Sequence, residues 1–187
     1  SSAAMLFVRP EAMAQRIRGY ARAVTESQEV VPLAEPSHWD PSSFRDGIES
    51  TLQSFVDGQA SWLAALGEDA QRLVEHARIS VSGGKRFRAS FCWWGHLAIA
   101  DPSDPRFDAD ALMRACASLE LLHASALVHD DYMDASDVRR GRPATHRAFE
   151  ELHRANGWSA SAAQYGASAA ILLGDLLLSW ADELLRL

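Results

Sequence analysis

The clearest candidates for binding or catalytic chemistry are three aspartates at the end of a long apolar segment: Asp130, Asp131 and Asp134. On a helix, Asp130 and Asp134 would project side by side, about one turn apart, where like charges repel each other. A hard divalent cation removes this repulsion, and Mg²⁺ usually takes one or two protein carboxylates together with water and phosphate oxygens. The spacing therefore predicts a Mg²⁺ site, with a solvated acidic helix end as the alternative interpretation of this motif by itself.

The sequence before the aspartates favours the metal site. At about 100° per residue, one narrow arc of the expected helix contains Glu120, His123, Leu127, Asp130 and Asp134. An apolar stripe adjoins this arc and consists of Leu119, Leu122, Ala126 and Met133. We therefore expect the polar arc to border the core, where charges persist only when they have partners such as a metal and an anion.

Three arginines follow the aspartates in a short loop: Arg139, Arg140 and Arg142. The planar guanidinium group matches phosphate oxygens in pairs, so a carboxylate–Mg²⁺ pole beside an arginine pole could hold a diphosphate from both sides. The alternative is that these arginines only neutralise the acidic turn.

A second basic segment lies at residues 82–88, where Gly83 and Gly84 break the chain before Lys85, Arg86 and Arg88. Free backbone N–H groups and the positive end of a helix dipole favour an anion at such a turn. The segment is not a P-loop, because no strand precedes it and the GxxxxGK[ST] spacing fails. By itself it is equally compatible with a flexible surface connection.

Helical periodicity dominates the rest of the chain, and no convincing alternating strand is found, so the expected fold class is all-α. We predict a single domain over residues 1–187, with residues 1–41 as an N-terminal extension and first helix. The expected helices cover residues 10–26, 42–66, 68–79, 85–100, 109–135, 145–154 and 159–187. The helix 42–66 is expected to bury one apolar stripe: Phe44, Ile48, Leu52, Phe55 and Trp62. The last pattern runs to the final residue, so we expect the native polypeptide to continue beyond it.

Composition limits the classes of partner. A net charge of −7 and a pI of about 5.4 argue against a nucleic-acid partner, because such a surface repels phosphate backbones. The apolar stretch 167–180 is interrupted by Asp175, which indicates a buried core helix and no transmembrane segment. Cys92 and Cys116 have no metal or redox spacing and are expected to be reduced thiols in a cytoplasmic protein.

On these motifs the sequence resembles the trans-isoprenyl (polyprenyl) diphosphate synthases, including farnesyl and geranylgeranyl diphosphate synthases. Residues 120–143 are similar to the first aspartate-rich region of that family, and residues 83–88 (GGKRFR) are similar to its GGKRLRP motif. The resemblance runs from about residue 45 to the end. It implies an isoprenoid synthase helical bundle around a central cavity, of which the N-terminal half to two-thirds is present.

The resemblance also implies a reaction, in which isopentenyl diphosphate attacks the cation formed from an allylic diphosphate and a longer polyprenyl diphosphate results. Asp130 and Asp134 would bind Mg²⁺ with Asp131 in support, and Arg139 would contact the same allylic diphosphate. The diphosphate of isopentenyl diphosphate would be held by Gly84, Lys85, Arg86, His123 and Arg140. Such prearranged charges stabilise a departing diphosphate, and an apolar cavity protects the cation from water.

Two departures from the family pattern affect these expectations. Ala89 stands where the family commonly has proline, and the second aspartate-rich motif is missing, so the 187-residue chain alone is expected to be inactive. Ser125 and Ala126, just before the first motif, are small, which resembles enzymes that make geranylgeranyl or longer products. The family is typically homodimeric, so a homodimer is implied as well.

Other classes of protein also fit parts of the sequence. The sequence contains two Glu-x-x-His pairs, Glu120/His123 and Glu150/His153, of the kind used by di-iron carboxylate bundles, with Glu49 and Glu75 as candidates for the further ligands. The favoured interpretation of Glu150 and His153 is that they lie on a solvated face. A non-catalytic partner subunit of a prenyl synthase could retain the same fold. A class I terpene cyclase also uses a DDxxD motif, but it binds no second diphosphate that would explain the basic segment 82–88.

Overall fold

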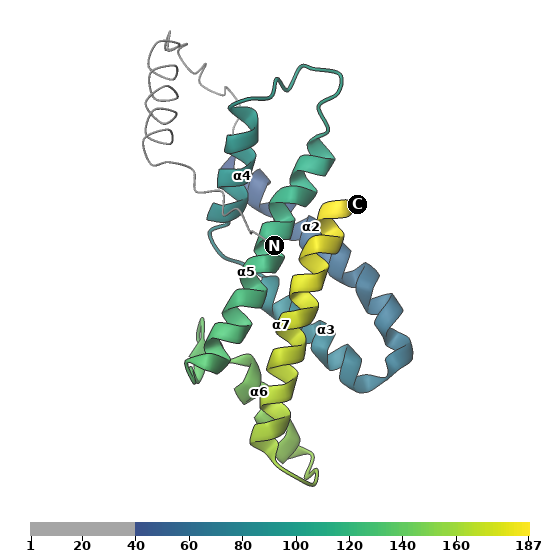
Figure 1. Ribbon diagram of the computed structural model, residues 1–187, viewed down its shortest axis with the longest axis vertical. Helices are drawn as coiled ribbons and strands as arrows, with labels where there is room; N and C mark the ends of the chain where they lie inside the picture. The colour runs from purple at the N-terminus through teal and green to yellow at the C-terminus, as the bar shows by residue number, and fades with distance from the viewer. Residues whose placement is uncertain (1–39) are drawn as a thin grey trace, which may run out of the picture. The chain divides into compact units, whose positions relative to one another are not determined.

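Two long helices, α5 (Ala109–Met133) and α7 (Ala162–Arg186), pack along each other and form the centre of the fold (Figure 1). The computed structural model describes residues 40–187, so the expected helix 10–26 and nearly all of the extension 1–41 lie outside the described part. The elements around α5 and α7 are α2 (Pro41–Leu63), the short 3₁₀ helix η1 (Ala64–Leu66), α3 (Glu68–Val81), α4 (Phe87–Leu97) and α6 (Thr145–Ala155).

Polar side chains start three of these helices. Asp40 caps α2, Asp108 caps α5 and Ser161 caps α7, and each side-chain oxygen accepts a hydrogen bond from a backbone N–H in the first turn. Pro41 occupies the first position of α2, where its missing N–H would have no helical partner. Local capping therefore fixes where the long helices begin.

The all-α expectation is confirmed, and most helix boundaries agree with the periodicity to within a few residues. Helix α4 begins at Phe87, two residues later than expected, because Arg86 has a left-handed backbone with φ 52°. The sequence pattern also missed a hairpin of two very short strands, β1 (Val138–Arg139) and β2 (Arg142–Pro143), in the loop after α5.

The buried face of α2 is largely the predicted one. Phe44, Ile48, Leu52 and Phe55 are buried, but the expectation for Trp62 is wrong, because this side chain is 82% exposed at the end of the helix. The residues of α2 after Val56 are not buried by other elements, so the apolar stripe extends beyond the surface that covers it.

The apolar stripe predicted on α5 does not form the core of the described residues. Leu122 and Met133 are exposed, and Ala126 is exposed as well. The buried apolar face of α5 consists mostly of small side chains, together with two leucines: Leu112, Cys116, Ala117, Leu121, Ala124 and Val128. Small residues suit this face because α7 approaches it closely, and periodicity alone cannot distinguish two apolar faces of one helix.

Two glycines of α7 allow this close packing. A Cβ added at Gly166 would lie 2.2 Å from the backbone oxygen of His146, and one added at Gly174 would lie 2.1 Å from Nε2 of His129. Helix α7 therefore contacts α6 and α5 where only a hydrogen atom fits. Ser125 supports the second contact by donating a hydrogen bond of 2.7 Å to the Gly174 oxygen.

Helix α5 is, within residues 40–187, the one helix whose length and apolar composition would be enough to cross a membrane. Half of its most apolar window is buried against the other helices, which is also typical of a central helix in a bundle. Length and composition are therefore weak grounds for a membrane span. The predicted core helix over residues 167–180 lies within α7, where Ala170, Leu173, Leu177 and Trp180 are buried.

Candidate functional site

A sharp turn ends α5 directly after the aspartates. Ala135 has a left-handed backbone with φ 52°, and the N–H groups of Ala135 and Ser136 bond to the oxygens of Tyr132 and Asp131 at 3.2 Å and 2.8 Å. This pattern is a Schellman motif, in which glycine usually occupies the left-handed position. The motif reverses the chain, so that the following residues return toward the last turn of α5.

The hairpin after this turn positions the arginines. Its two-residue loop, Arg140-Gly141, has positive φ at both residues (51° and 75°), as a type I′ turn requires, and Arg139 pairs with Arg142 across the strands. A left-handed conformation costs a non-glycine residue about 1 kcal/mol, so other contacts must hold Arg140 in place.

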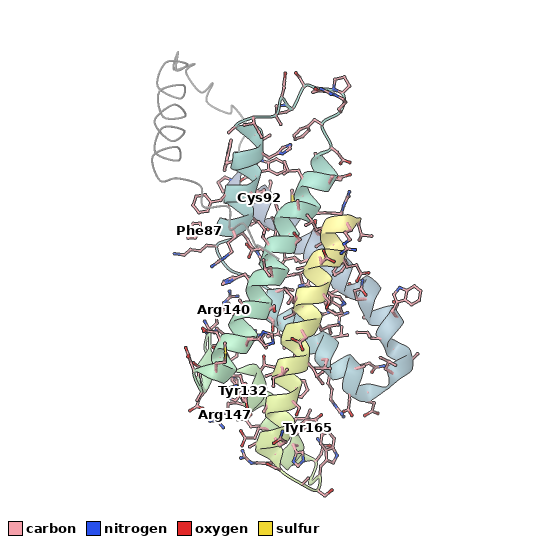
Figure 2. The ribbon with its side chains drawn as sticks, in the orientation of Figure 1. Phe87, Cys92, Tyr132, Arg140, Arg147 and Tyr165 are labelled. Atoms are coloured by element: carbon pink, nitrogen blue, oxygen red, sulfur yellow. The ribbon has the colours of Figure 1, made fainter. Side chains whose placement is uncertain are left out.

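Arg140 finds such contacts at the glycine turn before α4. Its Nη1 donates a 2.9 Å hydrogen bond to the Ser82 oxygen, and a Cβ added at Gly84 would lie 3.5 Å from its Nη2. Arg140 lies beside α5 in Figure 2. The two segments that the sequence singled out separately are therefore joined in space, and the positive φ of 99° at position 84 favours glycine there.

Arg139 is held by the buried second aspartate. Its Nε lies 2.9 Å from both carboxylate oxygens of Asp131, and its Nη2 also bonds to this carboxylate, which is 4% exposed. The hydrogen bond to Asp131, with the charges of Asp131 and Asp130, raises the pKa of Arg139. Nη2 lies 3.9 Å from Asp130, so the acidic and basic poles adjoin each other.

A cavity of about 420 Å³ opens where these segments meet. It is lined by Ser82, Gly83, Gly84, Asp131, Arg139, Arg140, Arg142, Ala144 and Thr145, together with residues of α3 and α6. The last two of these residues mark the start of α6, whose N-terminus has no side-chain cap. Its free N–H groups and the positive dipole end therefore add to the three guanidinium groups in favouring an anion.

The pKa of His123 reflects both its burial and the charges around it. Partial burial of the ring lowers its pKa, and the nearby charges of Arg88, Arg140 and Arg139 lower it further, against the opposing effect of Glu120. Burial is the larger cause, and the contributions of the three arginines show that positive charge lies near the ring, as phosphate binding needs.

Arg86 differs from the expectation that it contacts diphosphate directly. Its side chain is 5% exposed, forms ion pairs with Glu49 and Glu120, and is absent from the residues that line the cavity. The left-handed backbone at Arg86 turns this side chain inward. Arg88, which was predicted as a cation of the basic segment but not as a diphosphate ligand, is exposed in the first turn of α4 and acts on His123. The spacing of Arg88, three residues after Lys85 and thus on the same side of a helix, is the sequence signal for this role.

The remaining predicted cation and the two metal-ligand candidates are accessible. Lys85 is exposed, with Nζ 5.8 Å from the centre of the Phe87 ring. Asp130 lies in the last turn of α5 and Asp134 caps its end, and both are exposed. Residues 40–187 contain no group of three His, Cys, Asp or Glu side chains that could hold a metal. Two accessible carboxylates nevertheless fit Mg²⁺, which takes few protein ligands and prefers oxygen.

The two residues linked to product length lie on different sides of α5. Ser125 is buried against α7 through its hydrogen bond to the Gly174 oxygen, whereas Ala126 is exposed. Of the two positions, only Ala126 leaves its small side chain on the outer surface of the described helices.

The di-iron interpretation does not fit the structure, because each glutamate that it requires is paired with arginine. Glu49 and Glu120 pair with Arg86, and Glu75 lies 3.6 Å from Arg78. Glu150 pairs with two arginines, and His153 contacts the Ser159 oxygen and two aromatic rings. Both Glu150 and His153 are buried, which corrects the expectation that they lie on a solvated face.

Comparison with known proteins gives a consistent result. The family model described as polyprenyl synthetase matches residues 70–187. Nonaprenyl diphosphate synthase of Mycobacterium tuberculosis is 37% identical over 103 residues, which are 55% of this chain and 24% of that protein. The chloroplastic geranylgeranyl pyrophosphate synthase of Capsicum annuum is 29% identical over 166 residues, covering 87% of this chain and 38% of that protein.

A solved structure extends the similarity to the fold. Geranylgeranyl pyrophosphate synthase from Corynebacterium glutamicum, crystallised with isoprenyl diphosphate and magnesium, superposes with a TM-score of 0.75 at 38% identity. The match covers 79% of this chain and 42% of that chain. The helices therefore form an isoprenoid synthase bundle, and the chain spans about a quarter to two-fifths of the length of these relatives.

Proposed function

Because the chain belongs to the polyprenyl synthetase family, we propose that its full-length protein is a trans-prenyltransferase that joins isopentenyl diphosphate to an allylic diphosphate. The observation that carries this proposal is the meeting of the glycine turn, the arginine hairpin and the end of α5 around one cavity. Two adjacent diphosphate sites need both basic segments and the aspartates close together, whereas any one of these motifs could function without the others.

The first site is for the allylic diphosphate, at the end of α5. Asp130 and Asp134 would hold Mg²⁺, which when bound offsets the negative charge that develops on a departing diphosphate. Arg139 contacts Asp131 only through Nε and Nη2, so its Nη1 donors remain for phosphate oxygens. Buried Asp131 fixes the direction of this guanidinium group before substrate arrives, as electrostatic stabilisation of a leaving group requires.

The second site is for the diphosphate of isopentenyl diphosphate, on the side of the glycine turn. Arg140, Arg88 and His123 lie in this region, and Gly84 is exposed beside the Arg140 guanidinium group. Lys85 is exposed at the same turn and can reach an anion through its flexible side chain. These groups bind and orient the diphosphate, so that the isopentenyl double bond can face the allylic carbon.

The product that we propose is geranylgeranyl diphosphate or a longer chain. Relatives named as geranylgeranyl and nonaprenyl synthases support this length, as does the small Ala126 on the exposed side of α5. We also propose a homodimer in the cytoplasm. Apolar side chains that stay exposed on α7 support further burial in the full-length assembly: Ile171, Leu172, Leu178 and Leu185.

The test is incubation of the full-length protein with isopentenyl diphosphate, Mg²⁺ and each allylic diphosphate in turn, followed by separation of the products. We expect a polyprenyl diphosphate of twenty carbons or more. Mg²⁺-dependent diphosphate binding without any product would instead support a non-catalytic partner subunit. Cyclised hydrocarbon products would identify a terpene cyclase and contradict the proposal.

A further inference from the structure

A buried arginine lies between two glutamates beneath the glycine turn. Arg86 Nη1 donates to Glu120 of α5 at 3.1 Å, and its Nη2 bonds to Glu49 of α2 and, at 2.7 Å, to the Val81 oxygen at the end of α3. The guanidinium group therefore joins three helices that meet at the start of α4. We call these three side chains, Glu49, Arg86 and Glu120, the brace.

The brace also holds the backbone on both sides of Arg86. The Gly83 N–H donates to Glu49 at 3.2 Å, and the Ala89 N–H in the first turn of α4 donates to Glu120 at 3.3 Å. Each glutamate thus contacts the arginine and one backbone N–H of the segment 83–89. The left-handed conformations of Gly83, Gly84 and Arg86 are fixed between these two anchor points.

We propose that Arg86 is a positioning residue, which shapes the glycine turn for a diphosphate through Glu49 and Glu120 and does not contact the anion itself. The identity of the anion rests on the proposed function, whereas the brace rests only on the contacts above. The brace carries one positive and two negative charges and would repel a nearby phosphate group. Anion binding therefore depends on what the brace holds in place: the Gly84 backbone and the side chains of Lys85 and Arg88.

Removal of the Glu49 carboxylate distinguishes a positioning role of Arg86 from direct contact, because the two roles predict opposite changes in diphosphate affinity. If Arg86 bound diphosphate, Glu49→Ala would free the guanidinium group, remove a negative charge and strengthen binding. If the brace positions the turn, Glu49→Ala releases the Gly83 N–H and one arm of Arg86. The dissociation constant should then rise about tenfold, equivalent to the loss of one to two hydrogen bonds.

The experiment is titration calorimetry of the full-length protein with inorganic diphosphate, which needs no turnover. Glu49 is suited to the change because its side chain is partly exposed, with 36% accessible area. Glu49→Gln is the second variant, because it keeps the shape and hydrogen-bonding capacity and removes the charge. It should bind diphosphate more tightly than Glu49→Ala. The matched control is Glu68→Ala, which removes an exposed helical glutamate paired with Arg72 and should leave the constant unchanged.

Tighter binding by Glu49→Ala, or an unchanged constant in that variant, would overturn the positioning role. So would equal losses in Glu49→Ala and Glu68→Ala, because the loss would then not depend on the brace. Absence of prenyl transfer by the unaltered protein would contradict the proposed function instead, and the calorimetric comparison would still decide the role of Arg86.

Discussion

Arg140 donates a hydrogen bond to the backbone oxygen of Ser82, and this contact ties the loop after α5 to the turn before α4. The two residues come from the two basic segments that frame the cavity. Arg140 has a left-handed backbone in the hairpin turn, and the glycine turn that it contacts has positive φ at Gly83 and Gly84. The geometry of the site therefore depends on backbone conformations that are unfavourable in isolation.

Replacing Arg140 should test this connection. Arg140→Ala removes a guanidinium group from the cavity and releases Ser82, so diphosphate affinity should fall at least about tenfold, since hydrogen bonds to charged groups contribute roughly 1.5–3 kcal/mol. Calorimetry with inorganic diphosphate measures the change. Arg106→Ala is the control, because Arg106 is exposed and paired only with Asp104. Equal affinity in the two variants would show that Arg140 does not contribute.

Gly166→Ala should strongly destabilise the fold. The new methyl group would collide with the His146 backbone oxygen, which cannot move without shifting the start of α6. Overpacking of this kind costs about 1–3 kcal/mol or more, and urea unfolding followed by circular dichroism would measure it. Gly58→Ala on α2 is the matched control, because nothing lies within 4 Å of its added Cβ. That change should stabilise by about 0.5–1 kcal/mol, since alanine favours helices.

Ala135→Gly should stabilise the protein although it shortens a side chain. The left-handed position after α5 suits glycine, so the substitution relieves about 1 kcal/mol of backbone strain, less the entropy that glycine adds to the unfolded chain. Thermal unfolding would show a higher midpoint. A midpoint lowered by several degrees would mean that the alanine methyl group makes contacts that matter more than the backbone strain.

Stability should fall as the pH drops below about 6.5. The pKa values of His76, His123 and His146 are lowered, in each case mainly by burial, and Nδ1 of His146 is buried without a hydrogen-bond partner among the described residues. Below 6.5 the unfolded chain binds protons that the folded state does not, so the free energy of unfolding decreases down to the folded-state pKa values.

Urea midpoints measured between pH 8 and pH 5 would give the slope of this loss. His76→Gln should make the slope shallower, because it removes one ring that is buried in the neutral form. The matched control, His96→Gln, removes an exposed ring. A midpoint that rises on acidification through this range would contradict the assignment.

The sequence was informative wherever periodicity or local chemistry decides the structure. The extents of most helices and the position of Asp130 and Asp134 at the end of α5 follow from residue types and spacing. The brace could not be predicted, because the inward direction of Arg86 depends on a left-handed backbone that non-glycine residues rarely adopt. Sequence likewise could not choose the buried face of α5, because that face depends on how α7, α4 and α2 pack against the helix.

The measurement that tests the account most directly is the Mg²⁺ dependence of diphosphate binding. Calorimetry on the full-length protein should show tighter binding of inorganic diphosphate when Mg²⁺ is present. In the double variant Asp130→Ala/Asp134→Ala, this Mg²⁺-dependent increase should disappear, while the weaker binding by the arginines remains. An increase of the same size in the double variant and in the unaltered protein would contradict the account.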